Sequence, residues 1–221
     1  MKKKLLLISF IILIMLLFYF FYIFNKEYLI SSYSTSLKER DPSQLNNIIY
    51  AASMINNIKI KPGKVFSFNS TVGERTDPYF RKAKAVVGNK IEDASGGGIC
   101  QLSSTLYNAA LLANLKITER HPHNIAVSSV PPGLDATVSY GFYDLKFKNP
   151  YPFPLKVTAK AKGERLIISI YGKKIKDKTR IITEEVPDYN PGIKHVKVWR
   201  EITDKSGKIT KEFISDDIYS K

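Results

Sequence analysis

Residues 5–24 form one uncharged apolar stretch, LLLISFIILIMLLFYFFYIF, which contains no glycine and no proline. Because a helix rises about 1.5 Å per residue, this stretch would span about 30 Å, the thickness of a bilayer's hydrocarbon core. Lysines precede it, and aromatic side chains gather at its far end, as they do at membrane interfaces. We therefore predict that residues 1–25 are a cytoplasmic stub followed by an N-terminal transmembrane helix.

A cleavable signal peptide is the alternative for this segment. Signal peptides have a shorter apolar region, about 7–15 residues, that ends at a small-residue cleavage site. The residues at the end of this stretch, YFFYIFNKEY, offer no such site. We therefore expect a single-pass protein of the cell membrane, held through residues 5–24, with the rest of the chain outside the cytoplasm.

Composition limits the partners and the metal chemistry that the chain can use. The formal net charge is +14, with 34 Lys and Arg residues against 20 Asp and Glu. No basic run interleaves with stacking aromatics, so nucleic acid is not an expected partner. Anionic wall polymers and lipid head groups are the polyanions outside the membrane, and lysines that only keep the domain soluble are the open alternative. A single cysteine excludes an internal disulfide and an all-cysteine zinc site.

The pattern of apolar residues predicts helices first and strands afterwards. Apolar positions at helical spacing predict a helix over 45–57, and residues 101–115 predict a central buried helix. Later segments alternate with a period of two. We predict an α+β fold in which the central helix, preceded by a glycine-rich loop, packs on an antiparallel sheet. The expected strands are 65–68, 83–87, 125–130, 136–140, 145–147, 155–159 and 166–171, with a hairpin of 196–202 and 208–214. The expected division is a tether over 26–44, an α+β domain over 45–185 and a β-hairpin appendage over 186–221.

Cys100 is the residue most able to carry chemistry. It follows three glycines and lies at the start of the predicted central helix, where the helix field favours a thiolate. Backbone N–H groups at 100–101 could hold an oxyanion, and the glycines would let a substrate approach the backbone. The alternative is a small buried apolar residue, the common role of a lone cysteine. The candidate substrate-binding residues are Gly97, Gly98, Gln101 and Arg75.

A cysteine nucleophile needs a base, and the chain has only three histidines. His123 opens a predicted strand, which is a rigid place for a general base, and His121 lies two residues before it. Asp135 and Asp144 are both placed to orient the imidazole, and the sequence does not choose between them. Cys100 together with the pair His121 and His123 would supply only three metal ligands, so a carboxylate would have to complete the set. We expect neither a metal nor a cofactor.

Four segments together resemble the VanW family: FSFNSTVGERT (66–76), GGGICQLSSTLYNAALLANL (96–115), ERHPHN (119–124) and VPPGLDATVSYGFYDLKFKN (130–149). The resemblance runs over about residues 60–160. It implies an envelope protein of Gram-positive bacteria, from a family named after an accessory gene in glycopeptide (vancomycin) resistance clusters.

The segment around Cys100 also resembles transglutaminase-like thiol enzymes, in which a Gly-x-Cys motif opens a helix. Those enzymes continue with a histidine on one strand and an aspartate on the next, an order matched by Cys100, His123 and Asp135 or Asp144. This second resemblance implies a transglutaminase- or papain-like core. The tryptophan that follows the histidine in those enzymes is absent, because Asn124 and Ile125 stand in its place.

Two functions follow from these patterns. The first is a cysteine hydrolase or acyltransferase that acts on amide bonds of peptidoglycan peptides or their precursors. In it Cys100 attacks, His123 shuttles the proton, and Asp135 or Asp144 orients His123. The second is a non-catalytic, wall-binding accessory protein linked to glycopeptide resistance.

Overall fold

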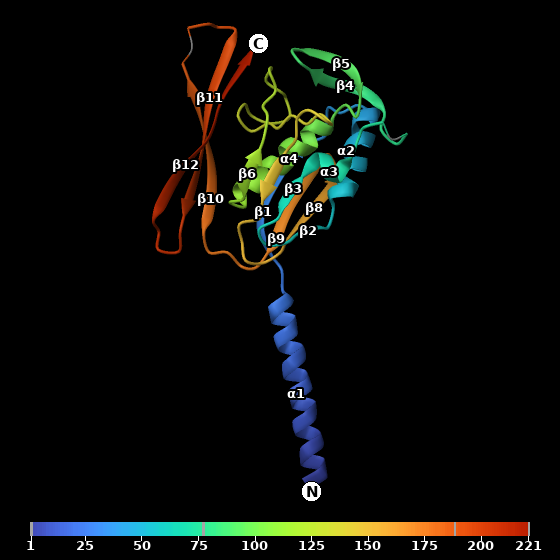
Figure 1. Ribbon diagram of the computed structural model, residues 1–221, viewed down its shortest axis with the longest axis vertical. Coiled ribbons are helices and arrows are strands. Elements are labelled where there is room, and N and C mark those ends of the chain that lie inside the picture. The colour runs from blue at the N-terminus through green and yellow to red at the C-terminus, as the bar shows by residue number, and fades with distance from the viewer. Residues whose placement is uncertain (1, 77, 188, 221) are drawn as a thin grey trace.

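Antiparallel strands dominate the computed structural model, which describes residues 2–76, 78–187 and 189–220 (Figure 1). The side chains of residues 2, 3, 5–9 and 24 are outside that description. The helices in the described residues are α1 (Lys2–Asn25), α2 (Pro42–Ile55), α3 (Phe68–Val72) and α4 (Ile99–Leu112). The strands are β1 (Tyr28–Ser36), β2 (Ile58–Ile60), β3 (Val65–Ser67), β4 (Lys82–Val87), β5 (Lys90–Ser95), β6 (Lys116–Glu119), β7 (Lys146–Lys148), β8 (Leu155–Lys162), β9 (Arg165–Gly172), β10 (Lys178–Val186), β11 (Ile193–Thr203) and β12 (Ile209–Ser220).

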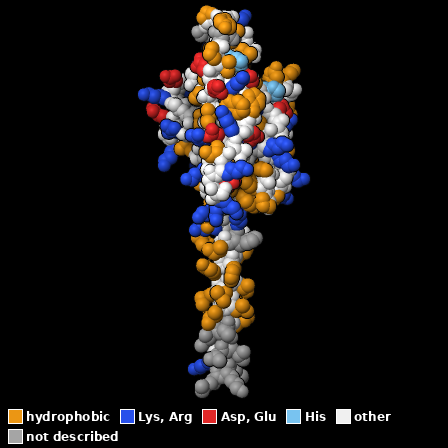
Figure 2. All heavy atoms as spheres, turned by 90° about the vertical axis from the view of Figure 1, so that its left-hand side faces the viewer, with side chains coloured by type: hydrophobic (Ala, Val, Ile, Leu, Met, Phe, Trp, Pro, Cys, Tyr) orange, Lys and Arg blue, Asp and Glu red, His pale blue; other side chains and the backbone are white. Residues whose placement is uncertain are grey.

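Helix α1 extends away from the rest of the chain and covers the stretch that was predicted to span a membrane (Figure 1). Part of that stretch, 5–9 and 24, lies outside the residues whose side chains are described. The described apolar side chains, within residues 10–23, are exposed (Figure 2). Within the described part of the chain, no helix has the length and apolar character of a membrane span. The transmembrane helix that was part of the predicted fold class is therefore not found among the described residues.

The largest sheet has the order β1-β9-β8-β2, with every neighbouring pair antiparallel. Residues of β8 alternate between buried and partly exposed, as expected for a strand that covers a core on one face. Strand β1 lies in the segment that was expected to be an irregular tether, and it pairs with β9 from Tyr28 to Ser36. Its small hydroxyl side chains reach α4, where Ser31 donates to the Ala109 carbonyl and Thr35 bonds Thr105. These polar contacts explain why the sequence of β1 looked like a linker.

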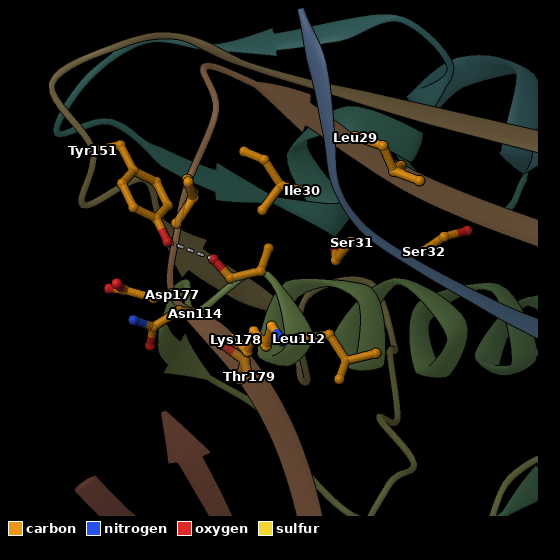
Figure 3. A pocket seen from close by; sticks show the side chains of 12 residues that line it. Leu29, Ile30, Ser31, Ser32, Leu112, Asn114, Tyr151, Asp177, Lys178 and Thr179 are labelled. Atoms are coloured by element: carbon orange, nitrogen blue, oxygen red, sulfur yellow. Dashed lines mark hydrogen bonds between the residues drawn. The ribbon is translucent and has the colours of Figure 1, made fainter. Parts of the chain in front are cut away.

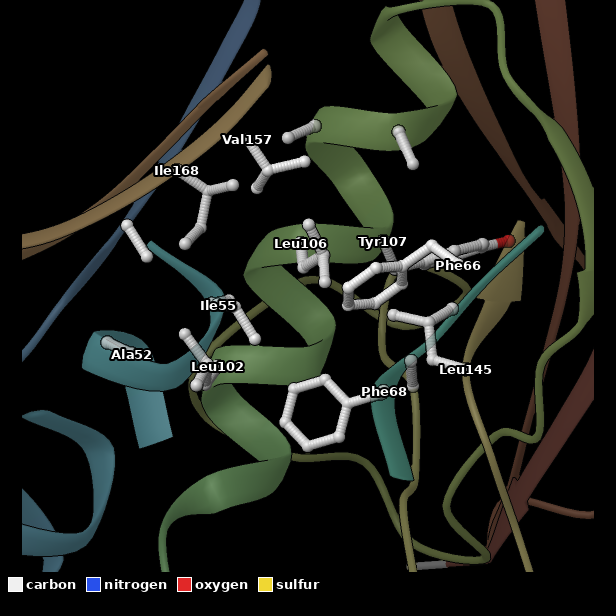
Figure 4. Packing of buried hydrophobic residues seen from close by; sticks show 14 of the residues in the cluster. Ala52, Ile55, Phe66, Phe68, Leu102, Leu106, Tyr107, Leu145, Val157 and Ile168 are labelled. Carbon is white, nitrogen blue, oxygen red and sulfur yellow. The ribbon is translucent and has the colours of Figure 1, made fainter. Parts of the chain in front are cut away.

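Helix α4 lies at the centre of the main hydrophobic core. Leu102 and Leu106 are fully buried between the large sheet on one side and the β3-β7-β6 sheet on the other (Figure 4). Helix α2 covers a further face of α4. It begins at a capping box in which Asp41 accepts from the N–H groups of Ser43 and Gln44. Tyr107 of α4 is also buried, and the buried partners drawn around the helix are Ala52, Ile55, Phe66, Phe68, Leu145, Val157 and Ile168.

The predicted fold class, a central helix on one antiparallel sheet with a transglutaminase- or papain-like core, is wrong. The described strands form four separate sheets, and together they account for much more of the chain than the helices do. The expected strands 125–130 and 136–140 are turns with isolated bridges. In the second of these segments, side chains of α4 take up backbone groups instead: Ser103 donates to the Ala136 carbonyl, and the Ser104 hydroxyl accepts from the Ala136 N–H. These bonds replace the ladder that a strand would have formed.

The C-terminal residues build a three-stranded sheet of order β10-β11-β12, where the sequence predicted only a hairpin appendage. The turn between β11 and β12 is closed by Asp204, whose carboxylate accepts from the N–H groups of Ser206 and Lys208. A second, smaller core holds this sheet on the segment before Asp135. It consists of Val130, Leu134, Val196 and Val198.

Candidate thiol site

Cys100 lies in the first turn of α4, which begins directly after the glycine turn. Gly98 is the residue before the helix and has a left-handed conformation, with φ of +95°. Such a φ strains any residue with a Cβ, so the turn that presents Cys100 depends on glycine. The thiol thus lies at the positive end of the helix dipole.

Gly97 is restricted by space and not by φ. A Cβ at this position would lie 2.3 Å from the Ala83 carbonyl oxygen and 2.8 Å from that of Lys84, both on β4. Backbone atoms cannot move aside as a side chain can, so β4 would have to shift. The glycine turn therefore fixes the distance between β4 and the start of α4.

We predict that Gly97→Ala lowers the free energy of unfolding by about 1–3 kcal/mol, because the added methyl group overpacks against the backbone. Gly192→Ala is the matched control, since its Cβ would meet only the side-chain oxygen of Asn190 at 3.2 Å. Urea unfolding of both variants measures the difference. Equal stability of the two variants would show that the close approach to β4 is unimportant.

The Cys100 thiol is half-buried and lies between a backbone carbonyl and an imidazole. Its Sγ donates to the Val138 carbonyl at 3.7 Å, and its side chain hydrogen-bonds the His123 ring. Burial raises the pKa of the thiol. The hydrogen bond and charge of His123 and the charge of Arg75 oppose this and give a pKa below the usual value. The surroundings therefore favour the thiolate.

His123 is buried and bonded on both sides of its ring. Nδ1 lies 2.6 Å from Asp135 Oδ2, so the Nδ1–H donates to the carboxylate and Nε2 is left for the thiol. The His123 backbone N–H donates to the same oxygen at 2.7 Å. Burial lowers the pKa of the imidazole, but its bonds to Asp135 and Cys100 outweigh burial and raise that pKa to about 9. The pair is suited to a thiolate–imidazolium state near neutral pH.

Asp135 is completely buried and accepts four hydrogen bonds. His123 gives two to Oδ2. Oδ1 accepts one from Arg120 Nη2 at 2.9 Å and one from the Tyr219 hydroxyl at 2.6 Å. Burial raises the pKa of this carboxyl, and the His123 bond, the Arg120 charge and the Tyr219 bond together bring it below the usual value. Asp135 therefore stays ionised and is fixed in one orientation.

Asp144, the alternative partner for His123, lies elsewhere. It accepts from the Ser67 hydroxyl at 2.6 Å and from the Asn69 and Leu145 N–H groups at 2.8 Å each. These bonds fix the start of α3, next to the β3-β7-β6 sheet. Of the two aspartates that the sequence left open, the structure places Asp135 on the imidazole.

The predicted substrate-binding residues fall into two groups. Gly97 and the buried Gln101 serve packing, because Gln101 donates to Thr35 and to the Ser36 carbonyl and its own N–H bonds the Gly98 carbonyl. That N–H is thus occupied, which leaves the Cys100 N–H as the remaining candidate oxyanion donor from positions 100–101. Arg75 is half-buried, and its charge acts on Cys100 while its guanidinium bonds the Gly73 carbonyl and Asn69.

The other two histidines are outside this arrangement. His121 bonds Glu119 at 3.2 Å and packs on the Tyr143 ring, and His195 pairs with Asp216 on the C-terminal sheet. In the described residues, no group of three or more His, Cys, Asp or Glu side chains is placed to hold a metal ion.

A cavity of about 320 Å³ lies at the opposite end of α4 from Cys100 (Figure 3). It is lined by the end of α4, by β1 and by the start of β10, and it contains Tyr151, whose hydroxyl donates to the Ala113 carbonyl. Because Cys100 occupies the first turn of this helix, the cavity has no part in the thiol site.

Sequence reasoning missed two sets of residues that build the site. The first is the polar face of α4, where Ser103, Ser104 and Asn108 bind the backbone of residues 134–136. Ser104 and Asn108 gave a readable signal, since positions 100, 104 and 108 follow one another at intervals of four residues and share a helix face. The second set, Arg120, Asp217 and Tyr219, offered no such signal because Asp217 and Tyr219 lie on the last strand.

Comparison with known proteins identifies a matching family but no relative of known structure. The family model described as "VanW like protein" matches residues 43–171. A protein of Bacillus subtilis named "Uncharacterized protein YoaR" is 40% identical over 147 residues, which cover 66% of this chain and 48% of that protein. The "Vancomycin B-type resistance protein VanW" of Enterococcus faecalis is 32% identical over 135 residues, 58% of this chain and 49% of that protein. The chain thus spans about half the length of these curated relatives. No solved structure matches it.

Proposed function

The chain belongs to the VanW-like family, and from that premise we propose that it is a glycopeptide-resistance-related envelope protein whose thiol site acts on amide bonds of peptidoglycan peptides. The observation that supports this most is the chain of contacts from Cys100 through His123 to Asp135. A nucleophile, a base within reach and a third group that orients the base are the parts that thiol catalysis needs.

The proposed reaction begins with the thiolate of Cys100. Its sulfur attacks the carbonyl carbon of an amide, and the carbonyl oxygen becomes an oxyanion near the Cys100 N–H at the start of α4. The His123 imidazolium gives its proton to the departing amine, and a thioester remains on Cys100. Water, or a second amine in a transfer reaction, then attacks the thioester and gives its proton to His123, which restores the thiolate.

The surface beside the thiol supports a peptide substrate. Val138, whose carbonyl contacts Cys100, leads into a turn that carries the exposed side chains of Tyr140 and Phe142. Arg75 adds a positive charge close to the thiol. Exposed aromatic surface and a cation next to the nucleophile suit a peptide that carries a carboxylate.

Incubation with purified muropeptides tests the proposal, with products read by mass spectrometry. We expect the wild-type protein to shorten or join peptides, and we expect Cys100→Ala and His123→Ala to lose this completely, because each removes a group that takes part in bond making. His195→Ala is the matched histidine control and should keep the activity. Equal products from wild type and Cys100→Ala would contradict a thiol mechanism.

A second candidate function, non-catalytic binding to an anionic wall polymer, is favoured by a different surface. The outer face of β8 and β9 carries a hollow of about 390 Å³ lined by Lys156, Lys160 and Lys162. Lys59 lies directly opposite Lys156 across the β2–β8 pair, which adds a further lysine beside this face, although Lys156 itself already pairs with Glu27. In the muropeptide experiment this function predicts no products from any variant, and equal retention of wild type and Cys100→Ala on isolated cell walls.

A further inference from the structure

Strand β12 enters the candidate site from beyond residue 171, where the family match ends. Asp217 and Tyr219 are two residues apart and both are buried, so they project from the same face of the strand. The Tyr219 hydroxyl donates to Asp135 Oδ1 at 2.6 Å and accepts from the Gly133 N–H at 2.8 Å. Asp217 accepts two bonds, of 2.6 and 2.7 Å, from Arg120 Nη1.

Arg120 joins the two acids of this cluster. Its Nη2 donates to Asp135 Oδ1 at 2.9 Å and its Nε to the Asp135 carbonyl at 2.6 Å, while the other side of the guanidinium bonds Asp217. The side chains of all three residues are at most 5% exposed. Such a desolvated, fully bonded cluster has little freedom to move.

The same strand also holds the backbone next to His123. The Ser220 N–H donates to the Asn124 carbonyl at 2.8 Å and its hydroxyl to the same oxygen at 3.0 Å. Behind these contacts, β11 lies so close to the 130–135 segment that a Cβ on Gly133 would meet Val198 at 2.5 Å. The C-terminal sheet therefore fixes both the base and the carboxylate that orients it.

We propose that β12 contributes to the thiol site by holding its residues in position. Tyr219 is a positioning residue, which sets the reactivity of Cys100 through Asp135 and His123. The inference rests on the proposed thiol site and adds the C-terminal sheet to it. Asp135 can aim Oδ2 at His123 Nδ1 only while Oδ1 is held. Without the Tyr219 hydroxyl, Oδ1 keeps one donor, Arg120, and the carboxylate gains freedom to turn away from the imidazole.

The test is the rate at which iodoacetamide alkylates Cys100 in the full-length protein, measured between pH 5.5 and 9. Tyr219→Phe removes one oxygen atom and keeps the buried ring. We expect it to slow alkylation at pH 6.5 by about threefold or more, the effect of one hydrogen bond. Tyr151→Phe is the matched control, because its hydroxyl also donates a hydrogen bond, to the Ala113 carbonyl at the far end of α4. It should leave the rate unchanged.

A double-mutant cycle separates positioning from a general loss of structure. If Tyr219 acts through Asp135, Tyr219→Phe should have almost no further effect in an Asp135→Asn background. An effect of equal size in both backgrounds would overturn the proposal, as would an unchanged rate for Tyr219→Phe alone. Circular dichroism of each variant shows that the compared proteins are folded.

Failure of this inference is distinguishable from failure of the proposed function. A wild-type thiol that titrates at or above its ordinary pKa would remove the proposed function and the inference together. A wild-type thiol with a lowered pKa that Tyr219→Phe does not change would remove only the role of β12.

Discussion

At pH 6.5 iodoacetamide will alkylate Cys100 in the folded protein faster than it alkylates a model thiol, and His123→Ala will reduce the rate by about tenfold or more. The reason is that the His123 bond and charge, together with the start of α4, hold the pKa of the thiol below its usual value. Removing the imidazole leaves burial as the main influence, and burial favours the neutral thiol.

The pH dependence of the alkylation rate shows in which direction His123 shifts the pKa of the thiol. In the wild type the thiolate is present below the ordinary thiol pKa of about 8.5, since the imidazole stays protonated up to about pH 9. In His123→Ala the rise in rate should move to higher pH. His195→Ala controls for the loss of a histidine elsewhere and should follow the wild type. Because the chain has a single cysteine, the reagent reports on this thiol alone. Folded protein that resists the reagent from pH 6 to 9 would contradict an accessible, activated thiol.

The sequence could identify the members of the thiol site because each has a distinctive type and place. A lone cysteine after three glycines, and the second histidine of a His-x-His pair, were enough to select Cys100 and His123. Choosing Asp135 over Asp144 needed the structure, since both aspartates follow a turn. Their bonding differs only in three dimensions, where Asp135 meets His123 and Asp144 meets the start of α3. The catalytic roles themselves stay predictions.

The fold was harder to predict because polar side chains stand where regular strands were expected. Residues 125–130 and 136–140 alternate like strands, yet they form turns with isolated bridges, and Ser103 and Ser104 on α4 bind the backbone of Ala136. Serines and threonines in 28–36 read as a linker, yet they form β1 and bond α4. Periodicity reports which side chains are apolar, but it does not report which element will satisfy a backbone group.

The C-terminal sheet shows a further limit of prediction from the sequence. Residues 186–221 were predicted to be an appendage, because nothing in their composition ties them to Cys100. The tie is made by Asp217 and Tyr219, which are about 80–100 residues away in sequence from Asp135 and Arg120. Contacts of such large separation leave no local pattern, so only the folded structure could show them.

We expect the largest loss of stability from Arg120→Met, which keeps much of the side chain's volume and removes its charge. Asp217 would then lose both of its bonds from the guanidinium, and Asp135 would lose the cationic partner that faces its Oδ1. Uncompensated carboxylates in a buried cluster are strongly unfavourable, so the free energy of unfolding should fall by about 3–5 kcal/mol. Urea unfolding at pH 7 measures this loss.

Arg180→Met is the matched control for that experiment. Arg180 also pairs with a carboxylate, that of Glu201 on the neighbouring strand of the C-terminal sheet, but its side chain is 70% exposed. Water screens this pair, so its loss should cost no more than about 1 kcal/mol. The contrast matters because the two arginines differ in burial and not in chemistry. Equal stability of the two variants would mean that the Arg120 cluster does not hold the C-terminal sheet on the site, and β12 would then be the appendage that the sequence indicated.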